Sequence, residues 1–187
     1  MERNLSVLKL TQGGIIAVLA FVSFQFFRIS TPVATIHFGN SFVIIGALLL
    51  GGFYGGVAGA VGLTISDVLS GYMSDAPATF ICKVLIGLIA GVIAHQIFKI
   101  NQTNDKKKIV MVATVSSAVA LFVNIFSDTL IRWLMNILMY GFDSAKVLAI
   151  KNLLGSSINL VLGTIVAVIF YIVIRPALKK SGLFIEK

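Results

Sequence analysis

The sequence predicts an all-α membrane protein with six transmembrane helices and with both termini in the cytoplasm. Of its 187 residues, 58% are hydrophobic and only 12% are charged, and the mean hydropathy is +1.01. A water-soluble chain of this size has too little interior to hide that much apolar surface. Because a membrane helix takes about 20 residues, we expect a single membrane domain, residues 1–187, with no room for a soluble catalytic domain.

Six hydrophobic stretches are expected to be the helices. The expected spans are residues 10–28, 41–53, 56–71, 77–98, 109–139 and 145–175. The first is longer than a signal-peptide core and lacks a small-residue cleavage site, so we expect it to be retained. The second and third are short for a hydrocarbon core about 30 Å thick. They must therefore tilt, be shielded by neighbours or be broken.

The charge-free run of residues 41–66 could form one long helix or two short ones broken at its glycines, and the basic residues decide between them. Two helices place ten basic residues on the side of the termini: Arg3, Lys9, Lys99, Lys106, Lys107, Lys108, Arg175, Lys179, Lys180 and Lys187. The other side then has three: Arg28, Lys146 and Lys151. One long helix would instead place four basic residues on the inside and nine on the outside. The positive-inside rule favours six helices with cytoplasmic termini.

The same rule accounts for the net charge of +8. The basic residues sit at helix ends rather than on one patch, so we expect no nucleic-acid partner. The hydrophilic segment NQTNDKKK, residues 101–108, is expected to be a cytoplasmic loop that helps to set this topology. Residues 71–77 are expected to turn on the outer side, with Pro77 in the first turn of the fourth span.

Four ionisable residues lie inside hydrophobic spans, where each costs on the order of 2.5–3.5 kcal/mol on insertion scales. They are Asp67, Lys83, Asp128 and Arg132. At 1.5 Å per residue, Lys83 lies about 9 Å below the outer start of the fourth span and Asp128 about 28 Å above the inner start of the fifth. We therefore expect these charges to meet in the outer half of the membrane.

Polar residues of the last two spans form one stripe on each helix, because residues three or four apart share a face. The fifth span carries Asn124, Asp128, Arg132 and Asn136, and the sixth carries Asn152, Ser156 and Asn159. Facing stripes predict a cavity. The structural alternatives are an ion pair between Asp128 and Arg132 one turn apart, pairing of Asp67 with Lys83, and amide hydrogen bonds between helices.

Motifs for several enzyme classes are missing from the sequence. It has no GxxxxGK[ST] loop for ATP, no HExxH, no cysteine and histidine cluster and no GxSxG. The single cysteine, Cys82, has no intrachain partner. We therefore expect no catalytic residues, no bound metal and no cofactor. In the first span, Gly13 and Ala17 are spaced so that another helix can approach closely, either within the chain or from a partner.

Two segments resemble a known family. They are FGNSFVIIGALLLGGFYGGVAGAVGLTISDVLSGY, residues 38–72, and PATFICKVLIGLIAG, residues 77–91. Together with six expected helices and a basic loop between the fourth and fifth, these segments resemble the S components of energy-coupling factor (ECF) vitamin transporters. The likeness covers nearly the whole chain. It is greatest to the riboflavin-related group that includes predicted pyridoxine and hydroxymethylpyrimidine binders.

The resemblance implies a subunit in the plasma membrane of a bacterium that binds one vitamin from outside and associates with a coupling subunit and two ATPases. It implies that the loop after the first helix and the fourth to sixth helices bind the vitamin. Together with the polar stripes, this gives nine expected substrate-binding residues: His37, Asn40, Lys83, Asn124, Asp128, Arg132, Asn152, Ser156 and Asn159. The family's contact with the coupling subunit maps onto Gly13, Ala17 and Ala20.

The residues leave the vitamin and the energy source open. Two acids, two bases and several amides suit a pyridine or pyrimidine alcohol such as pyridoxine or hydroxymethylpyrimidine, and would also accommodate riboflavin or pantothenate. A self-sufficient transporter with Asp67 or Asp128 as its proton-coupling carboxylate is the main alternative mechanism. An intramembrane enzyme is a third class, and no evident nucleophile supports it.

Overall fold

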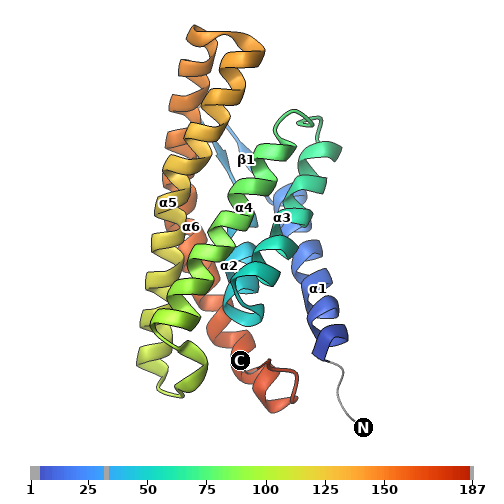
Figure 1. The fold of residues 1–187 in the computed structure, drawn as a ribbon, viewed down its shortest axis with the longest axis vertical. Helices are drawn as coiled ribbons and strands as arrows, with labels where there is room; N and C mark the ends of the chain where they lie inside the picture. Colours follow the sequence, from blue (N-terminus) through green and yellow to red (C-terminus); the bar gives the residue numbers. More distant parts are fainter. Residues whose placement is uncertain (1–4, 32–33, 186–187) are drawn as a thin grey trace.

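The computed structural model describes residues 5–31 and 34–185, which form a helical bundle with one small β-hairpin (Figure 1). In chain order the elements are α1 (Leu5–Phe26), β1 (Ile29–Ser30), β2 (Thr35–Ile36), α2 (Gly39–Leu50), α3 (Gly52–Leu69), α4 (Ala76–Gly91), the π-helix η1 (Val92–Ile97), the 3-10 helix η2 (Ile100–Gln102), α5 (Lys106–Tyr140) and α6 (Phe142–Lys180). α1 begins and α6 ends at one end of the bundle, beside the α4–α5 connection. We call this the terminal end. The opposite end, with the α3–α4 and α5–α6 turns, is the cavity end.

Five helices within the described residues are long and apolar enough to cross a membrane. They are α1, α3, α4 continued through η1, α5 and α6. α2 has only 12 residues, or about 18 Å at 1.5 Å per residue, so it cannot cross a core of about 30 Å alone. Every residue of α2 is buried. The short second span is therefore shielded by the other helices, one of the three ways in which we expected it to be accommodated.

The charge-free run does divide into two helices. α2 ends at Leu50 and α3 begins at Gly52, with Gly51 between them at φ 88°. That backbone conformation is easy for glycine and strained for residues with a Cβ. The prediction of a break in this run is therefore confirmed, and a single positive-φ residue makes the turn.

Glycines on α3 let it lie directly against its neighbours. A Cβ on Gly55 would collide with the backbone of α2 at Gly46, and a Cβ on Gly56 would press against Gly87 of α4. Small residues permit such close helix approach in membrane proteins, where dispersion contacts and close packing hold helices together. The tight α2–α3–α4 packing fixes where Lys83 and Asp67 stand relative to the start of α2.

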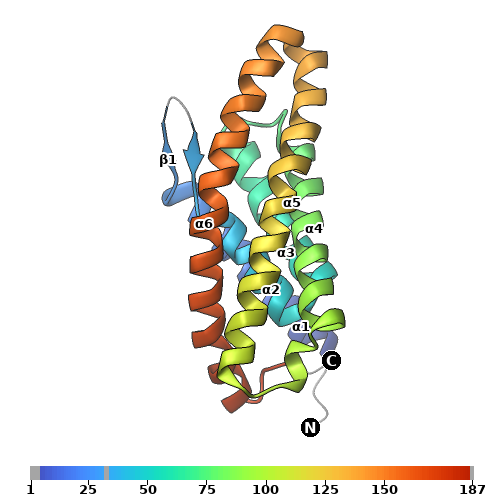
Figure 2. The same ribbon diagram turned by 90° about the vertical axis from the view of Figure 1, so that its left-hand side faces the viewer.

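α5 and α6 form a long antiparallel pair of 35 and 39 residues. They reach beyond the α3–α4 turn at the cavity end (Figure 1). The two-stranded hairpin pairs Ile29 with Ile36 and Ser30 with Thr35, and it stands beside α6 (Figure 2). These elements make the walls of the cavity end.

Arg175 on α6 holds the opposite end together. It is only 4% exposed, and its Nη2 donates to the carbonyl oxygens of Ile100 and Thr103 in the α4–α5 connection. Its guanidinium also lies 5.6 Å from the ring centre of Phe184. The segment after α6 is thus packed against the terminal end.

Candidate functional site: a polar cavity

A cavity of about 940 Å³ lies at the cavity end. Residues of α1 to α6, the β-hairpin and the α3–α4 turn line it. Ligand sites of proteins usually fall between about 300 and 1,000 Å³, so its size suits a small organic molecule. Unlike most of the bundle surface, its lining includes carboxylates, amines, amides and hydroxyls.

Eight of the nine expected substrate-binding residues line this cavity. They are His37, Asn40, Lys83, Asp128, Arg132, Asn152, Ser156 and Asn159. Asn124 does not line it, although it belongs to the stripe on α5. Asn124 is 3% exposed and lies one turn closer to the terminal end than Asp128, where the stripe faces packed helices instead of the cavity.

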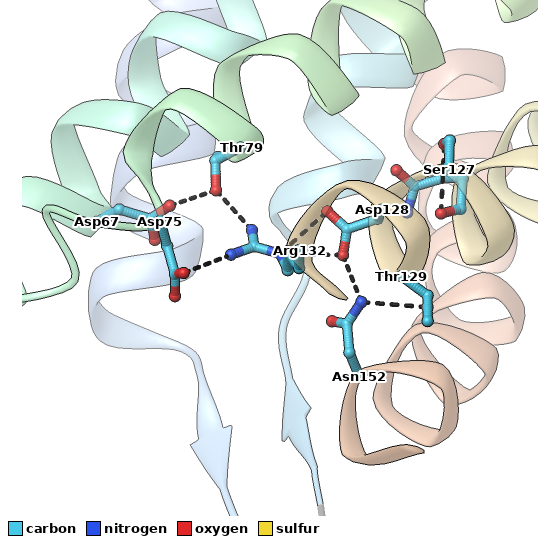
Figure 3. Close-up of polar contacts among 9 residues, drawn as sticks. Asp67, Asp75, Thr79, Ser127, Asp128, Thr129, Arg132 and Asn152 are labelled. Atoms are coloured by element: carbon cyan, nitrogen blue, oxygen red, sulfur yellow. Dashed lines mark hydrogen bonds and ion pairs between the residues drawn. The ribbon is translucent and has the colours of Figure 1, made fainter. Parts of the chain in front are cut away.

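Arg132 is the centre of a polar network on the cavity wall (Figure 3). Its Nε lies 3.2 Å from both carboxylate oxygens of Asp128. Its Nη1 lies 3.2 Å from Asp75, and its Nη2 donates to Thr79 Oγ1 at 2.7 Å. Thr79 in turn donates to Asp67. Three helices and the α3–α4 turn are therefore joined through a single guanidinium.

Asn152 extends the network to α6. Its amide nitrogen donates to Asp128 Oδ2 at 2.8 Å and to Thr129 Oγ1 at 3.2 Å. The expected ion pair within α5 is therefore present, and it also lines the cavity, so the structural and cavity-lining interpretations both apply. Asp67 is bonded through Thr79 and makes no ion pair with Lys83 within the described part of the chain.

Two network residues, Asp75 and Thr79, were missed by the sequence argument. The signal was present, because Asp75, Thr79 and Lys83 follow one another at four-residue steps. The same spacing identified the polar stripe on the fifth span. The sequence predicts a turn at Asp75, and a threonine has no charge that marks it within an apolar span.

The start of α2 forms another part of the cavity lining, through His37 and Asn40. The Gly39 N–H donates to Nδ1 of His37 at 3.2 Å, so a neutral imidazole carries its proton on Nε2. Burial first, and then the positive charge of Lys83, lower the pKa of His37 to about 3. The ring is therefore neutral at physiological pH and offers a donor.

Asn159 holds this loop in place. Its side-chain oxygen accepts from the His37 N–H at 3.0 Å, and its amide nitrogen donates to the Thr35 carbonyl at 3.0 Å. Both of its polar atoms are thus engaged by the chain itself. Although Asn159 lines the cavity, its hydrogen bonds position β2 and the start of α2.

Lys83 and Asn40 differ from these engaged residues. Lys83 is 6% exposed and Asn40 is 3% exposed. Lys83 makes no hydrogen bond or ion pair with any residue that the structure describes, and Asn40 Oδ1 likewise has no hydrogen-bond partner there. Both residues line the cavity, so these unengaged polar groups are available to a ligand.

Residues 5–31 and 34–185 contain no group of three or more histidine, cysteine or acidic residues arranged to hold a metal ion. Cys82 is buried and unpaired with another cysteine. The arrangement as a whole is suited to binding a polar molecule at the end of an apolar bundle.

A family model described as ECF-type riboflavin transporter, S component, matches residues 4–176. The chain belongs to this family. S components are membrane-embedded transporter subunits rather than enzymes, and they bind a vitamin and associate with an ECF module. No curated protein and no solved structure matches this S component.

The small residues on α1 of this S component face inward. Ala20 is fully buried, a Cβ on Gly62 would collide with the backbone of Ala17, and a Cβ on Gly13 would touch Ala58. The close approach that their spacing predicted is therefore made to α3 within the chain. Their expected contact with the coupling subunit would require the opposite, exposed face of α1 instead.

Proposed function

We propose that this S component captures a small water-soluble vitamin from outside a bacterial cell and delivers it inward together with an ECF coupling subunit and two ATPases. The observation that carries the proposal is the polar cavity of about 940 Å³ at one end of an apolar bundle. Family membership supports transport, and the buried polar groups without partners support binding inside the cavity.

The basic residues support an outward-facing cavity. Those at the terminal end include Lys99, Lys106, Lys107, Lys108, Lys179 and Lys180. Apart from Lys83 and Arg132 inside the spans, fewer lie at the cavity end, namely Arg28, Lys146 and Lys151. By the positive-inside rule the terminal end is cytoplasmic. The cavity then opens toward the side from which a vitamin is taken up.

Pyridoxine and hydroxymethylpyrimidine are the vitamins that we propose first. Both are flat heterocycles with polar substituents, and the cavity offers carboxylates and amides together with Tyr72, Tyr140 and Phe24. Riboflavin is the second candidate, because the family model carries its name and the cavity has room for a larger ring system. Pantothenate completes the set to be compared.

Equilibrium binding to the purified chain tests this proposal. We expect one of these vitamins to bind at submicromolar concentration, and Asn152→Ala to weaken it, because Asn152 holds Asp128 on the cavity wall. Ser157→Ala is the matched control, since Ser157 is exposed and bonds only the Leu153 carbonyl in the described chain. Absence of binding by every vitamin in the set would refute the proposal.

The energy source has its own test in proteoliposomes. We expect uptake only when the coupling subunit, both ATPases and ATP are present. Uptake by the lone chain under a proton gradient would show a self-sufficient transporter and would refute the ECF mechanism for this protein. Mass spectrometry of the transported compound should find it unchanged.

We propose the exposed face of α1 as the contact for the coupling subunit. Leu10 and Val18 are 77% and 59% exposed, and a Cβ on Gly14 would meet nothing within 4 Å. These three residues stand four apart, so they form one stripe. Gly14→Leu should leave the stability of the isolated chain unchanged and weaken co-purification with the coupling subunit, whereas unchanged co-purification would exclude this face.

A further inference from the structure

Lys83 is a buried amine without a hydrogen-bond or ion-pair partner among the described residues. Its side chain is almost wholly buried, at 6% exposure, and it lines the cavity. An ammonium group has three donors and no acceptor. Within the described residues it makes no hydrogen bond and no ion pair. A buried charge is costly unless it is paired and hydrogen-bonded, so an acceptor from outside the chain is needed there.

The carboxylates of the cavity, by contrast, are already engaged. Asp128 is held by Arg132 and Asn152, and Asp75 is paired with Arg132. Asp67 accepts from Thr79, as Figure 3 shows. These groups attract Lys83 through space, but none lies within ion-pair distance of it. Every carboxylate in the described lining of the cavity thus has a polar contact, whereas the buried Lys83 has none there.

The beginning of α2 adds a second group of donors on the cavity lining. A helix leaves its first N–H groups without intrahelical partners and carries partial positive charge at that end. The cap residue Phe38 supplies no side-chain acceptor. The Gly39 N–H donates to His37 and the Ser41 N–H to the Phe38 carbonyl, which leaves the Asn40 N–H without a partner among the described residues. Asn40, in the first turn, lines the cavity. Helix N-termini of this kind favour anions.

We propose that Lys83 and the N-terminus of α2 form a subsite for an anionic oxygen of the substrate. Neutral His37 can donate from Nε2 to the same region. This inference rests on the proposed function and narrows its substrate class to compounds with a carboxylate or an ionised ring hydroxyl. Pyridoxine, whose ring hydroxyl ionises near neutral pH, fits this class, as do pyridine carboxylates and pantothenate. Hydroxymethylpyrimidine and riboflavin have no such group at neutral pH.

Matched pairs of compounds test the subsite on the full-length chain. The pairs are pyridoxine with its 3-O-methyl ether, pyridine-3-carboxylate with pyridine-3-carboxamide, and pantothenate with panthenol. Riboflavin and hydroxymethylpyrimidine are measured alongside. We expect the tightest ligand of the panel to carry an anionic oxygen, and to bind roughly 10- to 100-fold more tightly than the partner compound that lacks it, the range of a hydrogen bond to a charged group.

Variants assign that difference to Lys83. Lys83→Met should abolish the preference for the anionic member, and Lys83→Arg should retain part of it. Lys146→Met removes a cation that lies on the outer surface of the α5–α6 pair, away from this cavity, and should leave the preference intact. The unfolding temperature of each ligand-free variant shows whether it folds. If Lys83→Met does not fold, the affinity ratios of the matched pairs, measured on Lys83→Arg and on the native chain, still test the subsite.

The outcomes separate the two proposals. If no compound in the panel binds the native chain, the proposed function fails and the subsite fails with it. If a compound without an anionic oxygen binds most tightly, or if Lys83→Met keeps the preference for the anionic oxygen, the subsite is refuted while vitamin binding stands.

Discussion

Replacing Asp128 by asparagine is the sharpest test of the cavity network. Asp128 is 4% exposed and receives Arg132 Nε on both oxygens and the Asn152 amide on one. Asp128→Asn keeps the shape, removes the charge and leaves Arg132 with Asp75, whose side chain is 39% exposed. Breaking a buried pair on one side costs about 3–5 kcal/mol. Because Asp75 still compensates part of the charge of Arg132, we expect Asp128→Asn to destabilise the protein by about 3 kcal/mol.

Thermal unfolding of the purified protein measures this cost. For a chain of this size, 1 kcal/mol corresponds to about 2–4 °C, so Asp128→Asn should lower the unfolding temperature by about 6–12 °C. Asp143→Asn is the control, because Asp143 is exposed in the first turn of α6, and surface changes usually stay within about 0.5 kcal/mol.

A double-mutant cycle separates the pair from its surroundings. Once Arg132→Gln has removed the cation, Asp128→Asn should cost much less, giving a coupling of about 2–3 kcal/mol. If the two changes instead add within about 0.5 kcal/mol, the two residues do not stabilise each other, and the network seen in Figure 3 is not the energetic centre of the site.

Three further predictions follow from particular contacts. Gly87→Val should destabilise the chain by about 1–3 kcal/mol, because its side chain would meet the backbone of Gly56; unchanged thermal unfolding would contradict the tight α3–α4 contact. Asn159→Ala should increase hydrogen exchange at the His37 amide, whose acceptor it removes; equal exchange in both proteins would show that Asn159 does not hold the loop. The folded pKa of His37, about 3, lies below its ordinary 6.5, so the unfolded chain takes up a proton first and stability falls as pH decreases through this window. The loss attributable to His37 reaches up to about 2 kcal/mol at pH 5. His37→Asn should therefore make unfolding less sensitive to pH between 7.5 and 5, whereas identical pH profiles would refute a half-buried imidazole that stays neutral.

Hydropathy and the spacing of polar residues predicted much of the site. The positions of Asp128, Arg132, Asn152 and Ser156 on shared helix faces follow from helical periodicity alone. Charge counting predicted that residues 41–66 divide into two helices, which the structure confirms with a turn at Gly51. Such properties are local, because they depend on the period of a helix and on the transfer of side chains from water to lipid.

What each side chain does was decided by tertiary contacts. Asn124 and Asn159 have the spacing of ligand residues, yet Asn124 lies below the cavity and Asn159 is occupied by the β2–α2 loop. Gly13 and Ala17 have the spacing that lets a helix approach closely, within the chain or from a partner, and the structure shows α3 in contact with them. Spacing determines which face of a helix a residue occupies. What covers that face depends on how the other helices pack.

The sequence by itself determined the class of protein, the helical segments and the helix faces that carry their charges, because these follow from transfer energies and helix geometry. Only the tertiary structure decided that the Arg132 guanidinium also reaches Asp75 and Thr79, that α2 begins at the cavity, and that Lys83 has no partner among the described residues. Pairing is a property of distances between separate helices, and those distances arise only when the glycine-lined helices pack.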